Sequence, residues 1–116
     1  MFNMISEASR EQLRQYVLHS AWPQVADLCQ RLLAADRADD TLWALLAEAF
    51  VHQGQDEAAI AAYLQGLKVQ DNQPKSHYAL AVLYKRQQKK ALAICHYQLA
   101  LQYSPGWQKA ALGLAK

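Results

Sequence analysis

The sequence predicts an all-α fold, and three observations support this class. Only four glycines and three prolines occur in 116 residues, whereas alanine, leucine and glutamine, which are compatible with helices, are abundant. Apolar residues recur at intervals of three and four, the spacing of one helix face. The pattern also repeats after 34 residues, with two helical segments around a polar turn in each copy. We therefore expect one domain of stacked helix hairpins over residues 1–116.

The repeat frame divides the chain into three copies and a final helix. The copies occupy residues 6–39, 40–73 and 74–107, the first being the weakest, and the frame continues into an opening helix at 107–116. The two stronger copies align without a gap. Their matching positions are Leu46 and Leu80, Ala47 and Ala81, Phe50 and Tyr84, Ala59 and Ala93, Ile60 and Ile94, Tyr63 and Tyr97, and Leu67 and Leu101.

The boundaries of the second copy have clear local signals. Asp39 and Asp40 precede the helix that carries Trp43, and Asp56 precedes the next helical run. A side-chain oxygen at such a position can cap the exposed amides of a helix start. Gly54 lies in the polar turn between the two runs, where it permits a sharp bend.

The third copy has the same layout with different turn residues. Gln88 stands where the second copy has Gly54, and Pro105 with Gly106 ends the last helical run. A single hairpin cannot cover its own apolar face, so repeat arrays end in a capping element. We expect the final helix to be that cap, with Trp107, Leu112 and Leu114 against the third copy.

These positions resemble the tetratricopeptide repeat. The matching residues are Trp43, Leu46, Ala47, Phe50, Ala59, Tyr63 and Gly66 in the second copy, and Leu80, Ala81, Tyr84, Ala93, Tyr97, Ala100 and Pro105 in the third. The resemblance implies a right-handed α-solenoid of antiparallel helix hairpins with about seven helices. It also implies a ligand groove on the concave face, lined by the first helix of each hairpin.

Departures from the family pattern are informative too. His77 replaces the usual tryptophan and Gln88 replaces the turn glycine. In the first copy Ser9, Gln12 and Leu13 stand where the family has other residue types. We therefore expect the first hairpin to pack irregularly.

Catalytic and metal-binding motifs are missing from the sequence. There is no glycine-rich phosphate loop, no Gly-x-Ser-x-Gly and no His-Glu-x-x-His. Cys95 and His96 are adjacent, but neighbouring helix residues point about 100° apart, so we interpret His96 as an exposed histidine. His19, His52 and His77 are interpreted as surface or edge residues. We expect no enzyme, no cofactor and no metal site.

The chain has no sequence signal for export or for the membrane. Its start contains acidic and polar residues within seven positions, and no window approaches the roughly 20 apolar residues of a membrane-spanning helix. Cys29 and Cys95 lie far apart in apolar helical runs, where a thiol behaves as a small hydrophobic group. We expect a cytoplasmic protein without membrane contact.

Charge is distributed unevenly along the chain. Ten acidic residues accompany five basic ones through residue 71, whereas no acidic and seven basic residues follow. If these basic residues line the concave groove, the groove would bind an acidic segment of a partner protein or peptide. The predicted contact residues are Lys75, Tyr78, Val82, Lys85 and Arg86 in the third copy, Leu45, Glu48 and His52 in the second, and Lys109 in the final helix. The alternative is a solvated face that keeps the protein soluble.

Other readings of the chain remain open. A known subgroup of the family clamps chaperone C-termini, and its clamp positions correspond to Arg10, Arg14, Leu45, Lys75 and Ala79. Only Arg10 and Lys75 fit the clamp in charge, so this subgroup is not favoured. The chain could instead be a module of, or a partner to, a larger enzyme such as a transferase. Nucleic-acid binding by the basic half is less favoured, while homo-oligomerisation by opposite charges is physically reasonable.

Overall fold

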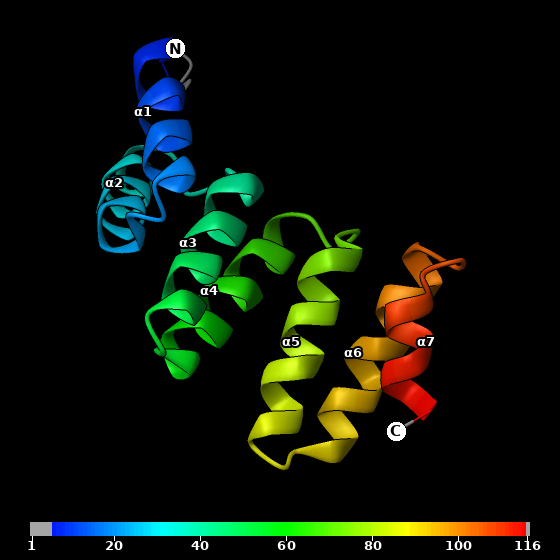
Figure 1. Cartoon of the computed structure of the whole chain (residues 1–116). Coiled ribbons are helices and arrows are strands. Elements are labelled where there is room, and N and C mark those ends of the chain that lie inside the picture. The colour runs from blue at the N-terminus through cyan, green and yellow to red at the C-terminus, as the bar shows by residue number, and fades with distance from the viewer. Residues whose placement is uncertain (1–5, 116) are drawn as a thin grey trace. The chain divides into compact units, whose positions relative to one another are not determined.

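The computed structural model describes residues 6–115, which form seven α-helices and no strand (Figure 1). The helices are α1 (Glu7–Leu18), α2 (Trp22–Ala35), α3 (Asp40–His52), α4 (Asp56–Val69), α5 (Pro74–Arg86), α6 (Lys90–Tyr103) and α7 (Gln108–Ala115). The predicted all-α class and the number of helices are confirmed. The predicted domain also includes residues 1–5 and 116, which lie outside the described part.

The helices group into two compact units that divide between Val69 and Gln70. Unit 1 contains α1–α4, and unit 2 contains residues 70–73 with α5–α7. Residues 70–73 are bonded to the start of α5, because the Ser76 hydroxyl donates to Gln73 Oε1 at 3.2 Å. This division falls just before the repeat boundary at residue 73. The single domain expected from the repeat frame stays a prediction.

Two helix starts in unit 1 differ in how they are capped. The Asp39 carboxylate accepts a hydrogen bond from the Leu42 amide at 3.1 Å, so the predicted N-cap of α3 is confirmed. At α4 the Gln55 carbonyl accepts from the Ala59 amide at 3.0 Å, and Asp56 is the first helical residue. Asp56 therefore follows the cap position that the sequence predicted for it, and its negative charge favours the helix N-terminus.

Small side chains bring α3 and α4 close together. Ala47 and Ala59 are fully buried, and Gly66 of α4 lies against Trp43 of α3. A Cβ added at Gly66 would lie 2.9 Å from the Trp43 Cβ. These small residues allow the two helices to approach closely, since larger ones would overlap their neighbours.

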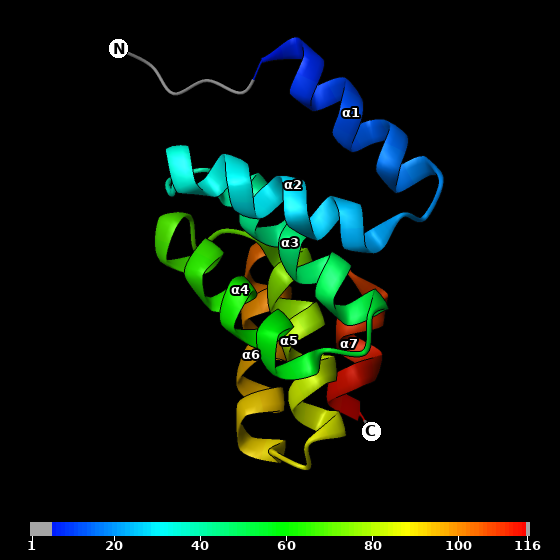
Figure 2. The same cartoon turned by 90° about the vertical axis from the view of Figure 1, so that its left-hand side faces the viewer.

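The first hairpin packs irregularly, as expected from its departures. Leu13 is the single buried residue of α1, whereas α3 buries four. Helix α1 packs on α2 and not closely on α3 (Figure 2). A hollow of about 320 Å³ lies between α1 and α3, lined by Leu13, Arg14, Val17, Leu18 and Leu45.

The turns inside the three hairpins share one backbone conformation. Ser20, Gly54 and Gln88 have φ values of 53°, 73° and 62°, and they lie 34 residues apart in the repeat frame. A positive φ disfavours residues that have a Cβ. Gln88 therefore has the conformation that the frame predicts, without the glycine that would allow it most easily.

Unit 2 is built on the α5–α6 hairpin, with α7 beside α6 (Figure 1). The hairpin buries Leu80, Ala81 and Ala93, together with the aromatic residues Tyr84 and Tyr97 that match the repeat pattern. One aligned pair departs from the repeat frame. Ile60 is 8% exposed in unit 1, but its counterpart Ile94 is 47% exposed.

The prediction that the final helix caps unit 2 is correct for some of its residues and wrong for one. It begins at Gln108, and Ala110 is its fully buried residue. Trp107 contacts Tyr78 of α5, with ring centroids 5.0 Å apart, so its predicted packing is confirmed. Leu114 is half-buried. Leu112 was expected to pack against the third copy, but it is 58% exposed and that expectation is wrong.

Candidate functional site

Three helices of unit 2 surround a hollow of about 230 Å³, called the basic hollow below. Its lining residues are Tyr78 and Lys85 of α5, Tyr97 of α6, and Lys109, Leu112 and Gly113 of α7. Tyr78 and Lys85 are seven residues apart, or about two helical turns, so they share one face of α5. The sequence predicted Tyr78, Lys85 and Lys109 as contact residues, and the structure brings these three together.

The floor of the basic hollow is aromatic. The Tyr78 ring meets the Tyr97 ring edge-on, with centroids 5.8 Å apart, and the Trp107 ring at 5.0 Å. Burial, and secondarily the neighbouring Tyr78, raises the pKa of Tyr97 above its ordinary value. The Tyr97 hydroxyl is therefore neutral at physiological pH, and the lysines carry the charge of the site.

Gly113 allows α7 to lie directly against α6. A Cβ at this position would overlap the ring of Tyr97, which is only 4% exposed. Any other residue would therefore force either the ring or the helix to shift. Because Lys109 and Leu112 lie on the same helix, this close contact also positions two walls of the basic hollow.

Within unit 2 the basic hollow has few possible acidic counter-charges. Asp71 is the sole acidic residue of the sequence from residue 70 onward. Among the described residues, Arg14 pairs with Glu11 and Arg31 pairs with Asp27, and His77 contacts Asp71. Lys85 and Lys109 belong to none of these pairs, so their ammonium groups are exposed to an incoming anion.

The remaining predicted contact residues lie elsewhere. Lys75, Val82 and Arg86 are on α5 but do not line the basic hollow. In unit 1, Leu45 lines the hollow beside α1 and Glu48 is exposed. His52 stacks on Trp22, with ring centroids 4.1 Å apart and planes 3° from parallel. The role predicted for these residues stays a prediction.

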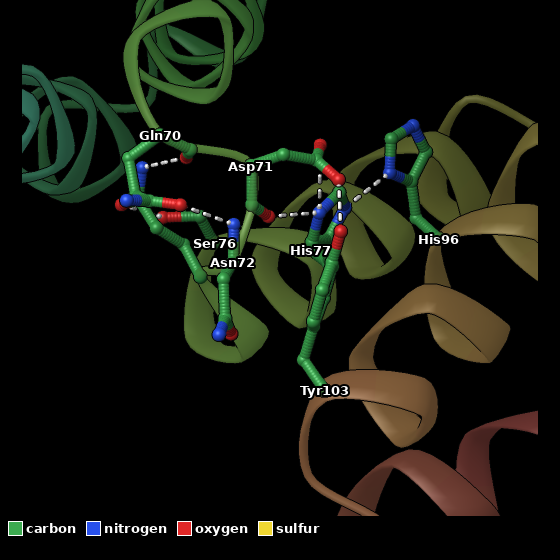
Figure 3. Close-up of polar contacts among 8 residues, drawn as sticks. Gln70, Asp71, Asn72, Ser76, His77, His96 and Tyr103 are labelled. Atoms are coloured by element: carbon green, nitrogen blue, oxygen red, sulfur yellow. Dashed lines mark hydrogen bonds and ion pairs between the residues drawn. The ribbon is translucent and has the colours of Figure 1, made fainter.

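A polar cluster on unit 2 was missed in the sequence (Figure 3). His77 is 1% exposed and its Nδ1 lies 3.0 Å from the Nδ1 of the half-buried His96. The interpretation of His77 as a surface residue and of His96 as exposed is therefore wrong. The signal was available for His77, because it occupies the position of the packing aromatic Trp43 in the preceding repeat.

The two cysteines also differ from each other. Cys29 is fully buried, and this burial, with a smaller effect of Asp39, raises the pKa of its thiol to about 12. Cys95 is a free, exposed cysteine, so it does not lie in the core as expected. Within residues 6–115 no three histidine, cysteine or acidic side chains gather into a metal-binding group. None of the described helices is both long and apolar enough to cross a membrane.

Two family profiles match the sequence. One is described as a TPR repeat and matches residues 47–88, and the other as a tetratricopeptide repeat and matches residues 74–106. A comparison with curated proteins gives no match.

Solved structures with the same fold are numerous, and three of them share 17–18% identity with this chain. MamA superposes with a TM-score of 0.87 at 17% identity, covering 93% of this chain and 63% of MamA. This chain thus spans less than two thirds of the length of MamA. The Yersinia enterocolitica secretion chaperone SycD, in complex with a peptide of the translocator YopD, superposes at 0.85 with 18% identity, covering 95% and 92%.

A third similar structure is the first TPR domain of Spaghetti (RPAP3), bound to the HSP90 peptide SRMEEVD. It superposes at a TM-score of 0.86 with 17% identity, covering 93% of this chain and 86% of that one. At such low identity these structures show the fold alone. The two profile matches together span residues 47–106, more than half of the sequence, and the chain therefore belongs to the tetratricopeptide repeat family.

Proposed function

We propose that this chain is a non-enzymatic protein-interaction scaffold whose basic hollow binds an acidic segment of a partner protein. The observation that carries the proposal is the placement of Lys85 and Lys109 around an aromatic floor, with no acidic residue paired to either. Proteins of this repeat family are in general interaction modules without catalytic activity, which agrees with the proposal.

The chemistry of the basic hollow fits a short segment with both acidic and apolar side chains. Two ammonium groups provide charge-assisted hydrogen bonds for a carboxylate. Tyr78 and Leu112 provide apolar surface beside them, and Leu112 is more than half exposed. A volume of about 230 Å³ suits one or two side chains of an extended peptide rather than a folded surface.

Structures with the same fold support a peptide ligand. SycD is solved with a translocator peptide, and the RPAP3 domain with a peptide that contains two glutamates and an aspartate. The contacts in this chain would nevertheless be its own. Leu45 and Ala79 stand at two positions where the chaperone-binding subgroup needs polar or basic residues, whereas Lys85 and Lys109 lie outside that set.

The test is a charge reversal with a matched control. The double variant Lys85→Glu with Lys109→Glu changes the basic hollow, while Lys89→Glu with Lys90→Glu makes the same change in net charge at the α6 start. Binding of a fluorescein-labelled peptide of alternating glutamate and leucine is measured by anisotropy. We expect the hollow variant to bind at least about tenfold more weakly, because each lost charged hydrogen bond contributes about 1.5–3 kcal/mol.

The control variant separates a specific site from a solvated basic face. We expect it to bind within about twofold of the wild type, because Lys89 and Lys90 do not line the basic hollow. Equal loss in both variants would show that net charge alone attracts the peptide, and the proposal would then be wrong. Unchanged binding in the hollow variant, with intact helical circular dichroism, would also remove Lys85 and Lys109 from the site.

A further inference from the structure

Two histidines, one from α5 and one from α6, meet across the hairpin (Figure 3). The Nδ1 atoms of His77 and His96 are 3.0 Å apart, and the ring centroids are 5.2 Å apart. The other ring nitrogen of His77, Nε2, lies 3.0 Å from the backbone carbonyl oxygen of Asp71. It also lies 3.5 Å from the Asp71 carboxylate oxygen Oδ1.

These partners determine which ring nitrogens carry hydrogen. A carbonyl oxygen only accepts, so His77 Nε2 is the donor to Asp71. In the neutral ring His77 Nδ1 then has a lone pair and accepts a hydrogen bond. His96 must therefore donate from its Nδ1, and its Nε2 is left with a lone pair.

One additional proton leaves the contact between the two rings intact, whereas a second proton breaks it. A proton on His96 Nε2 leaves the bond between the two Nδ1 atoms intact. A second proton must go to His77 Nδ1, where two N–H groups would face each other at 3.0 Å and two positive rings would be stacked. The hydrogen bond would be lost, and the like charges would push α5 and α6 apart.

Charged and aromatic groups of unit 2 lie around the pair. The Asp71 carboxylate, from the segment before α5, also accepts a hydrogen bond from the Tyr103 hydroxyl of α6. The Tyr84 ring of α5 stacks on His96 at 5.6 Å, and the Lys89 ammonium lies 6.0 Å from the Tyr84 ring. Burial, and secondarily His77, lowers the pKa of His96 below its ordinary value of 6.5, against an opposing effect of Asp71.

The histidine pair and the floor of the basic hollow lie at the same level of the hairpin. His77 precedes Tyr78 and His96 precedes Tyr97 in the sequence. Consecutive helix residues point about 100° apart, so the histidine contact and the tyrosine contact lie at different parts of the α5–α6 interface. A change in the spacing of α5 and α6 at the histidines would therefore also change the spacing at the neighbouring Tyr78–Tyr97 contact.

We propose that the His77–His96 pair is a pH-sensitive latch that holds α5 and α6 at the spacing required by the basic hollow, so that acid releases the acidic segment. This inference rests on the proposed function and concerns the regulation of the same site. The proposed effect of acid on affinity is opposite in sign to the effect of charge alone, because added positive charge would strengthen the binding of an anion.

The first experiment needs no ligand. Long-range ¹H–¹⁵N correlation spectra of the full chain at about pH 7.5 report which nitrogen of each histidine carries hydrogen. We expect hydrogen on Nε2 of His77 and on Nδ1 of His96, the form that the contacts require. Hydrogen on Nε2 of His96 would overturn the latch, whatever the hollow binds.

The second experiment compares peptide binding at about pH 7.5 and about pH 5.5. In the variant His96→Asn the side-chain amide can take the place of the Nδ1 donor and cannot titrate. We expect the wild-type affinity to fall at the lower pH by about tenfold, the effect of losing one hydrogen bond, and the variant to change by less than about twofold. The variant His19→Asn, at an exposed histidine in unit 1, should retain the wild-type response.

The outcomes separate the latch from the proposed function. An equal pH response in wild type and His96→Asn would overturn the latch while leaving the peptide site intact. Absence of peptide binding at the higher pH would overturn the proposed site. In that case the latch is still judged by the urea midpoint of unfolding, which should fall between the two pH values in the wild type and not in His96→Asn. A midpoint that falls equally in both proteins would contradict it.

The first proton, on His96, already lowers the stability, before a second proton on His77 breaks the hydrogen bond. The pKa of His96 is lower in the folded than in the unfolded protein, so the unfolded state binds the proton more readily. The contribution of neutral His96 to stability is therefore complete above its ordinary pKa of 6.5. It is lost as the pH falls through the lowered pKa of His96 in the folded protein.

Discussion

Replacing Gln88 by glycine should stabilise the protein, because of the backbone conformation in the α5–α6 turn. Gln88 has a φ of 62° and an exposed side chain. A residue with a Cβ is disfavoured in this region by about 1–2 kcal/mol. Glycine removes that cost but makes the unfolded chain more flexible, which offsets about 0.4–1 kcal/mol. The net effect of Gln88→Gly is a gain of about 0.5–1 kcal/mol in the free energy of unfolding.

The reciprocal substitution in unit 1 is the matched control. Gly54 has a φ of 73° at the equivalent repeat position, and a Cβ added there has no atom within 4 Å. The Cβ that Gly54→Gln introduces therefore has open space, and we expect the cost to come from the backbone. We expect a loss of about 0.5–1 kcal/mol, equal in size and opposite in sign to the effect of Gln88→Gly.

Urea unfolding followed by circular dichroism measures both variants. With a slope of about 1–3 kcal/mol per molar urea, the midpoint should rise by a few tenths molar in Gln88→Gly and fall by a similar amount in Gly54→Gln. If Gln88→Gly left the midpoint unchanged or lowered it, the positive φ would not be a source of strain. The energetic cost that we assign to a residue with a Cβ at this turn position of the repeat would then be wrong.

Three further predictions concern glycines and cysteines. Gly66→Ala places a Cβ 2.9 Å from the Trp43 Cβ, and the resulting overlap should lower the free energy of unfolding by about 1–3 kcal/mol in the same urea assay. In Gly113→Ala the added Cβ would overlap a buried ring of α6. This variant should displace α7 and weaken peptide binding, with only a small effect on the urea midpoint of unit 1. A thiol reagent at about pH 8 should modify Cys95 quickly and Cys29 only on unfolding, because Cys29 is fully buried with a pKa of about 12. Rapid modification of two thiols in the folded protein would show that Cys29 is not protected.

Most of the fold could be predicted because its signals are local and repeated. Ala47 and Ala81 are small at the same step of the frame, and both are fully buried. Asp39 caps α3 as its position before an apolar run indicates. Such signals need no knowledge of which helices touch, since side-chain size, spacing and capping act within one hairpin.

The candidate site could be predicted only in part. Helical spacing and charge predicted three contact residues that the structure places around one hollow, namely Tyr78, Lys85 and Lys109. Lys75 and Arg86 share their helix but do not line it. The difference depends on where α7 lies against α6, and that contact depends on Gly113 and the Tyr97 ring.

The sequence by itself determined the repeat period, the helix hairpins and the clustering of positive charge, because these are properties of residue order and composition. Tertiary structure alone decided that two histidines 19 residues apart would share a hydrogen bond, and that their neighbours Tyr78 and Tyr97 would form an aromatic floor. The physical reason is that a hydrogen bond requires about 3 Å between two atoms. No periodic pattern specifies a distance that short between side chains of different helices.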